Sequence, residues 1–233
     1  MTRPVPFGAL ELTGRTRQHV IPIDAPRGVV HVAVAKPLAA MRRAAQTAGI
    51  DLALASSFRD FDTQVRIWNE KWTGRRRLED RAGRVLEAGS LKPAARVAAI
   101  LAWSAPPGAS RHHWGTDVDV FDRAALPKGA KLALVPAEYA ADGPFAALTQ
   151  WLDANMHRFG FYRPYRIDRG GVAPEPWHLS HAPTAREASR RLRIATVRSA
   201  ITDAPIEGRD ALLKALPRVY ARYVRAVDAP PRR

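Results

Sequence analysis

Four of the seven histidines fall in two short segments that are rich in tryptophan and carboxylates, SRHHWGTDVDVFD at 110–122 and PEPWHLSH at 174–181. A catalytic zinc ion takes three protein ligands of nitrogen, oxygen or sulfur type and keeps one position for water. Because the chain has no cysteine, its ligands must be histidine, aspartate or glutamate. Two imidazoles and one carboxylate leave one net positive charge on the metal centre, which lowers the pKa of bound water and polarises a carbonyl group. The two segments therefore indicate metal-assisted hydrolysis.

Such a site also needs a carboxylate that is not a ligand and can accept the proton of water. Glu175, three residues before His178, is the natural candidate. Positions three apart on a strand point to opposite faces, so the two side chains converge only if the backbone bends between them, and Pro176 supports a bend. His112 and Asp119 are also an odd number of positions apart, and Gly115 permits the turn that would bring both inward.

Three motifs in order resemble the signature of one peptidase family. Ser110-x-His112-x-x-Gly115-x-x-x-Asp119, followed by Glu175-x-Trp177-His178, is similar to the SxHxxGxxxD…ExWH pattern of the VanY-type D-alanyl-D-alanine carboxypeptidases. The upstream SSFRDFDTQ at 56–64 resembles the SGYRSxxxQ segment of the same family. The family shares its fold with lysostaphin-type endopeptidases and the hedgehog signalling domain, so the resemblance implies a hedgehog/DD-peptidase-like zinc metallopeptidase.

The resemblance implies a role for each matched position. His112, Asp119 and His178 would bind Zn²⁺, and Glu175 would be the general base that later returns a proton to the leaving amine. Arg59 would grip a substrate carboxylate or carbonyl, a role that suits its planar guanidinium.

Other residues of these segments have weaker assignments. Gln64 and Ser110 would make further substrate contacts by resemblance. Asp117 lies two positions before Asp119 on the same strand face, where it would support a ligand or perturb the charge of the site. Three more residues flank the candidate ligands and are candidates for supporting them: Trp177, His181 and, less strongly, His113.

The elements that must position these residues follow from hydrophobic periodicity. Helices are predicted over 36–48, 61–73, 92–103 and 144–158, and strands from 52 for about five residues, over 116–122, over 131–136 and over 177–181. Residues 184–227 are predicted to form two amphipathic helices, the second kinked or restarted at Pro217. Short strands interspersed with helices favour an α+β fold, a small and mainly antiparallel sheet flanked by helices. We expect a single domain, with a catalytic core over about 30–183 and a helical extension over about 184–227.

The charge of +15 favours polyanionic partners, and anionic cell-wall polymer fits as well as nucleic acid does. Nucleic acid is the weaker expectation because no nucleic-acid-binding signature is present. No apolar run is long enough for a transmembrane helix, and no apolar stretch of the secretory kind is seen near the start. The resemblance implies a periplasmic or wall-associated protein, while the residues themselves leave a cytoplasmic one open.

The function expected from the resemblance is hydrolysis of a D-amino-acid peptide bond in peptidoglycan stem peptides, by a D-alanyl-D-alanine carboxypeptidase in the first place. A cross-link endopeptidase is the alternative within the enzymes. A non-catalytic zinc-containing module that binds cell wall or protein is the alternative outside them, and Glu175 argues against it because a module needs no base.

Overall fold

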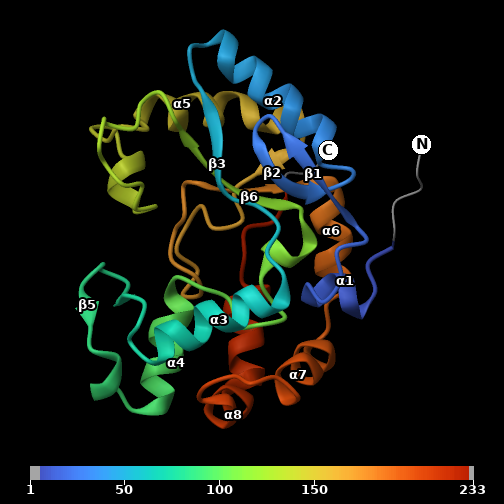
Figure 1. The fold of residues 1–233 in the computed structure, drawn as a ribbon, viewed down its shortest axis with the longest axis vertical. Coiled ribbons are helices and arrows are strands. Elements are labelled where there is room, and N and C mark those ends of the chain that lie inside the picture. Colours follow the sequence, from blue (N-terminus) through green and yellow to red (C-terminus); the bar gives the residue numbers. More distant parts are fainter. Residues whose placement is uncertain (1–5, 231–233) are drawn as a thin grey trace.

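A four-stranded antiparallel sheet lies at the centre of the computed structural model, which describes residues 6–230 (Figure 1). Its strands are β3 (Leu52–Ser56), β6 (Asp117–Asp122), β8 (His178–His181) and β7 (Phe161–Tyr162), in that spatial order. In β6 and β8, Asp119 lies opposite His178 and Asp117 opposite Ser180. The sheet therefore brings together segments that are about 60 residues apart in the chain.

Two small hairpins accompany this sheet. One pairs β1 (Val20–Asp24) with β2 (Arg27–His31), and the other pairs β4 (Leu78–Glu79) with β5 (Val85–Leu86). The first packs beside β3, and the second projects from the end of α3 (Figure 1). Neither hairpin extends the central sheet within the described residues.

Helices cover the sheet from one side and form a separate layer on the other (Figure 1). Helices α2 (Ala35–Thr47) and α5 (Ala146–Asn155) bury Leu38, Met41 and Leu148 against the sheet residues Val120 and Leu179. A one-turn 3₁₀ helix, Met156–Phe159, continues α5.

The other layer has its own hydrophobic core. Helices α3 (Phe61–Trp72) and α4 (Pro93–Ala102) pack there with α6 (Ala182–Arg191), α7 (Ile194–Thr202) and α8 (Arg209–Val219), and the short α1 (Ala9–Thr13) lies at its edge. Trp68, Leu101, Val197 and Leu212 are fully or almost fully buried in this core. A π-helical turn, Tyr220–Arg225, follows α8. The helical extension therefore completes a core that α3 and α4 begin.

The predicted α+β class is confirmed, as are the helices predicted over 36–48, 61–73 and 92–103 and the strands predicted from 52, over 116–122 and over 177–181, which form as β3, β6 and β8. The strand predicted over 131–136 is wrong: no strand forms there, since Leu134 has a φ of 54° and the Glu138 carboxylate takes the amide hydrogens of Ala133 and Val135. The prediction of two helices over 184–227 is also wrong. Three form, because the chain breaks at Leu192–Arg193 and again between Asp203 and Gly208.

None of the helices within residues 6–230 combines the length and the apolar character that a membrane span requires.

Candidate metal centre

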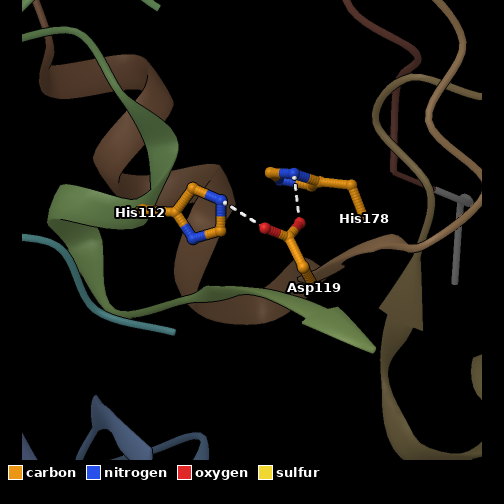
Figure 2. Close-up of side chains that lie close together, drawn as sticks. All are labelled: His112, Asp119 and His178. Atoms are coloured by element: carbon orange, nitrogen blue, oxygen red, sulfur yellow. Dashed lines mark ion pairs between the residues drawn. The ribbon is translucent and has the colours of Figure 1, made fainter. Parts of the chain in front are cut away.

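Three side chains from three elements converge where the sheet meets the helical layer (Figure 2). His112 lies in a 3₁₀ turn (Arg111–Trp114), Asp119 in β6, and His178 at the first position of β8. One nitrogen or oxygen atom of each lies within 4.8 Å of the others, and all three residues are buried. His112 Nε2 is 3.3 Å from Asp119 Oδ2, and His178 Nδ1 is 3.1 Å from Asp119 Oδ1.

The second nitrogen of each imidazole has a fixed partner. His112 Nδ1 lies 2.9 Å from the carbonyl oxygen of Ser57, which can only accept a hydrogen bond. His178 Nε2 lies 2.9 Å from Asp117 Oδ1, a carboxylate oxygen that also accepts. In the neutral imidazoles these contacts place the protons on the outer nitrogens, so His112 Nε2 and His178 Nδ1 turn their lone pairs toward Asp119.

Two lone pairs and a carboxylate facing one another repel unless a cation or an extra proton lies among them. Asp119 Oδ1 is buried and, within the described residues, accepts no hydrogen bond of regular geometry. Burial alone would lower the pKa of His178, but its contacts with Asp117, Asp119 and Glu175 outweigh burial and raise that pKa well above its ordinary value. The donor set therefore fits a divalent cation of the type that imidazole and carboxylate bind, such as zinc.

The turn expected at Gly115 is present and explains how His112 meets Asp119. Gly115 ends the 3₁₀ turn with a φ of 66°, in the left-handed region that glycine adopts without strain. A Cβ atom at this position would lie 2.5 Å from Val20 Cγ1 and 2.7 Å from the backbone nitrogen of His31. Only glycine therefore lets the chain reverse here while it packs against the β1–β2 hairpin.

The bend expected at Pro176 is also present. The amide of His178 donates to the carbonyl oxygen of Glu175 at 3.2 Å, which closes a turn over Pro176 and Trp177. The turn brings Glu175 Oε2 to 3.3 Å from His178 Nδ1, the nitrogen that faces Asp119. Glu175 therefore lies beside the three-residue cluster, where a base would act on a bound water.

Asp117 lies directly behind His178, at the centre of a buried polar cluster. Its Oδ1 accepts from Arg111 Nε at 2.7 Å, and its Oδ2 accepts from Thr116 Oγ1 at 2.5 Å and Ser180 Oγ at 3.1 Å. Burial acts to raise the pKa of Asp117, but the charge of Arg111 and the hydrogen bond from His178 hold it well below its usual range. In the register of β6 against β8, Asp119 thus joins the cluster and Asp117 orients His178.

Comparison with known proteins identifies the family. A model of the VanY D-alanyl-D-alanine carboxypeptidases matches residues 27–184. The chain belongs to the VanY family. An uncharacterized protein of Haemophilus influenzae is 38% identical over 118 residues, which are 50% of this chain and 90% of that protein. A D-alanyl-D-alanine carboxypeptidase of Enterococcus faecalis is 28% identical over 144 residues, 59% of this chain and 42% of that protein.

Three solved structures share the fold of this chain. VanYB in complex with D-alanine-D-alanine superposes with a TM-score of 0.52 at 21% identity, over 79% of this chain and 89% of that one. A variant of the D,D-pentapeptidase VanY in complex with Zn(II) has a TM-score of 0.50 at 23% identity, over 84% and 92% of the two chains. The LD-carboxypeptidase LdcB has a TM-score of 0.50 at 21% identity, over 84% and 77%.

Within this VanY-family site, Arg59 lies at the edge of the cavity and is held by neutral groups. Its guanidinium donates to Gln64 Oε1 at 2.9 Å and to Ser56 Oγ at 3.1 Å. Within residues 6–230 no carboxylate lies within 4.0 Å of it. Burial lowers the pKa of Arg59, partly offset by the charges of Asp119 and Glu175. This guanidinium is therefore available to an anionic ligand.

Gln64 and Ser110, both expected to contact substrate, occupy different positions. Gln64 is completely buried and is not among the residues that line the cavity, because its amide also donates to Ala105 O at 2.8 Å. It is thus placed to orient Arg59 rather than to touch a ligand. Ser110 does line the cavity, next to His112.

The three flanking residues, Trp177, His181 and His113, have different positions relative to the cluster. Trp177 lines the cavity and packs on Tyr139 with ring centroids 5.5 Å apart, so it supports the wall beside Glu175. His181 points away from the cluster: its Nδ1 lies 3.0 Å from Thr184 Oγ1 and its ring packs on Phe161. His113 is fully buried, and its Nδ1 lies 2.7 Å from the carbonyl oxygen of Arg59, so it fixes the backbone that carries Arg59.

The cluster opens into a cavity of about 640 Å³. Two residues of this site were not predicted from the sequence. Tyr165 packs its ring edge-on to His178, with ring centroids 4.9 Å apart. Arg111, the neighbour of His112 in the chain, is the residue that donates to Asp117. In the sequence, only the position of Arg111 between two predicted site residues, Ser110 and His112, points to a role for it. Nothing in the sequence of the long loop predicts that Tyr165 lies at the site.

Trp103 also lines the cavity, and its carbonyl oxygen accepts a long contact of 3.5 Å from Lys71 Nζ. Burial lowers the pKa of Lys71 to about 8, with the charge of Glu175 acting in the opposite direction.

Proposed function

We propose that this VanY-family chain is a zinc-dependent carboxypeptidase that removes the C-terminal D-alanine from peptidoglycan stem peptides. The observation that carries the proposal is the placement of Glu175 beside the His112, Asp119 and His178 cluster, with the lone pairs of both histidines directed at Asp119. VanYB, which shares the fold, is described in complex with D-alanine-D-alanine.

His112, Asp119 and His178 would hold the metal. A zinc ion bound there would supply Lewis acidity, which lowers the pKa of water and polarises the scissile carbonyl. Glu175 accepts the proton of the attacking water and returns it to the departing amine. Asp117 keeps the proton of His178 on Nε2, so that Nδ1 stays available inside the cluster.

Arg59 favours a carboxypeptidase over a cross-link endopeptidase. A guanidinium near the cavity that contacts only neutral groups is suited to a bidentate pair with the free carboxylate of a peptide end. The scissile bond would then lie between this carboxylate and the rest of the stem. Because the LD-carboxypeptidase LdcB shares the fold, cleavage of an L,D-bond is the second candidate to be tested.

A non-catalytic binding module is the less favoured alternative, since such a module needs no carboxylate at the position of Glu175. A peptidoglycan substrate would be met in the periplasm or at the cell wall, so we propose that the protein acts there, and the charge of +15 would help to retain it on anionic wall polymer.

The test uses a defined pentapeptide stem with a C-terminal D-Ala-D-Ala, incubated with the zinc-loaded protein and analysed by mass spectrometry. We expect release of one D-alanine, loss of that release with a chelator, and its return with added zinc. The tetrapeptide that ends in an L,D-bond and the pentapeptide amide are run beside it.

Glu175→Gln tests the base. The change should lower kcat by about 10²–10⁴-fold while zinc stoichiometry is retained. Glu207→Gln is the matched control, because Glu207 is exposed and its side chain has no contact with the site. If the pentapeptide stays intact in the presence of bound zinc, or if Glu175→Gln is as active as the parent, the proposal fails.

A further inference from the structure

The loop at 163–177, which joins β7 to β8 and carries Glu175, is held by contacts with the C-terminal end of the described chain. The residues that make these contacts, Arg222 and Asp228, follow α8 and lie outside the span 27–184 that matches the family. They belong to the part of the chain for which the proposed function provides no role.

Asp228 makes most of the contacts with the loop. It is 6% exposed, and its Oδ2 accepts from the backbone amides of Arg166 at 2.9 Å and Ile167 at 3.2 Å. Its Oδ1 accepts from the guanidinium of Arg169, at 2.9 Å from Nε and 2.6 Å from Nη2. Its own amide donates to the carbonyl oxygen of Pro164 at 2.8 Å. One aspartate thus satisfies donors and acceptors from four positions of the loop.

The π-helical turn contacts the same loop at a second place. Arg222 donates from Nε to the carbonyl oxygen of Gly170. Gly171 lies so close to the turn that a Cβ atom there would clash with the carbonyl oxygen of Arg222. The loop is therefore packed directly on the C-terminal backbone over residues 164–171.

Tyr165 transmits this placement to the catalytic cluster. Its two neighbours, Pro164 and Arg166, are both bonded to Asp228, and its carbonyl oxygen accepts from the amide of Glu175 at 2.9 Å. Its ring contacts the edge of His178. A short chain of contacts thus leads from Asp228 through Tyr165 to the backbone of the proposed base.

We infer that Asp228 is a positioning residue for Glu175: it holds Pro164 and Arg166 so that Tyr165 fixes the backbone from which Glu175 reaches the metal cluster. The inference rests on the proposed function for the role of Glu175. It makes the C-terminal segment a part of the peptidase site rather than an appended binding unit. A displacement of about 1 Å in a catalytic group costs on the order of 10²-fold in rate, so this placement matters for turnover.

The first test measures turnover of the zinc-loaded full chain with the pentapeptide stem. Asp228→Asn keeps the size of the side chain but removes its charge and one of its acceptor oxygens. We expect kcat to fall about 10- to 100-fold with zinc stoichiometry unchanged and KM changed less than threefold, because the base is displaced while the ligand set remains. Asp228→Glu, which keeps the carboxylate, should recover part of kcat. Asp210→Asn on α8 is the matched control, since its side chain is 100% exposed.

The second test does not depend on hydrolysis. The amide of Glu175 is protected by Tyr165 O, whereas the amide of Ala173 is protected by Ala102 O in the other layer. In the zinc-loaded Asp228→Asn variant, hydrogen exchange should accelerate at Glu175 at least tenfold and remain unchanged at Ala173.

The outcomes separate the two proposals. If the parent protein cleaves no peptide but the Glu175 amide loses protection in Asp228→Asn, the proposed function fails while the positional link stands. If the parent is active and Asp228→Asn has the same kcat and the same Glu175 protection, the inference is overturned. A fall in kcat that only follows the fraction of unfolded protein, with protection lost equally at Glu175 and Ala173, overturns it too.

Discussion

Replacing Asp117 with asparagine tests whether the carboxylate behind His178 sets the affinity of the metal site. Asp117 Oδ1 accepts from His178 Nε2 at 2.9 Å and from Arg111 Nε at 2.7 Å, while Thr116 and Ser180 bond the other oxygen. Asparagine can keep the carbonyl toward His178, but it removes the negative charge that makes His178 a stronger ligand. It also leaves the buried Arg111 without its counter-ion.

The magnitude follows from two effects. Loss of a carboxylate that orients a ligating histidine lowers metal affinity by about 10- to 100-fold, which corresponds to about 1.4–2.7 kcal/mol at 25 °C. Breaking a buried ion pair destabilises a fold by about 3–5 kcal/mol. Because asparagine retains a hydrogen bond to Arg111, we expect the loss of folding free energy in the metal-free protein to be about 1–3 kcal/mol.

The assay is a zinc titration against a competing chromophoric chelator, with urea unfolding of the metal-free protein beside it. Asp122→Asn is the control, because Asp122 is a buried carboxylate of the same strand whose Oδ1 accepts from the backbone amides of Asp51 and Ala124. It should lose stability and keep its zinc affinity. An Asp117→Asn variant that binds zinc as tightly as the parent would refute the argument that Asp117 acts on the metal through His178.

Two further predictions concern the backbone and a buried cation. Gly115→Ala should lower the free energy of unfolding by at least about 2 kcal/mol and weaken zinc binding, because its Cβ would meet Val20 and the backbone of His31. Gly83→Ala is the control and should lower the free energy of unfolding less, because Gly83 has a φ of 77° but open space around it. Equal urea midpoints for the two would contradict this. Lys71→Met should be about 3 kcal/mol more stable at pH 7, because burial lowers the pKa of Lys71 from 10.5 to about 8 in the folded state and each pKa unit corresponds to about 1.4 kcal/mol. Between about pH 8 and 10.5 Lys71 is protonated in the unfolded chain but neutral in the folded one, so the stability of the parent should rise with pH and the difference in stability between variant and parent should narrow. A difference that is absent at pH 7, or constant up to about pH 10, would contradict the prediction.

The sequence predicted the elements and residues whose information is local. The turns at Gly115 and Pro176 follow from the conformational preferences of glycine and proline, and both are present. The helix at 61–73 follows from its apolar face. The resemblance to the family then placed His112 and Asp119 in one site, which periodicity alone does not do.

What the sequence did not predict depends on contacts between distant segments. Leu134 adopts a left-handed φ in a stretch whose composition is typical of a strand, because the Glu138 carboxylate bonds the amides on both sides of it. Gln64 turned out to be buried behind Arg59, since the partners of its amide lie 40 residues away at Ser104 and Ala105. Asp228 lies just beyond the last predicted helix, and contacts with loop residues some 60 positions earlier bury it.

The four residues of β8 serve two purposes on alternate positions. His178 and Ser180 face Asp117 and the metal cluster, while Leu179, which is fully buried, faces the hydrophobic core under the sheet. A one-residue insertion between Pro176 and His178 would reverse these directions, sending an apolar side chain into the cavity and a polar one into the core. Ligand geometry and core packing would then fail together, so the length of this short segment is constrained as tightly as the identity of its residues.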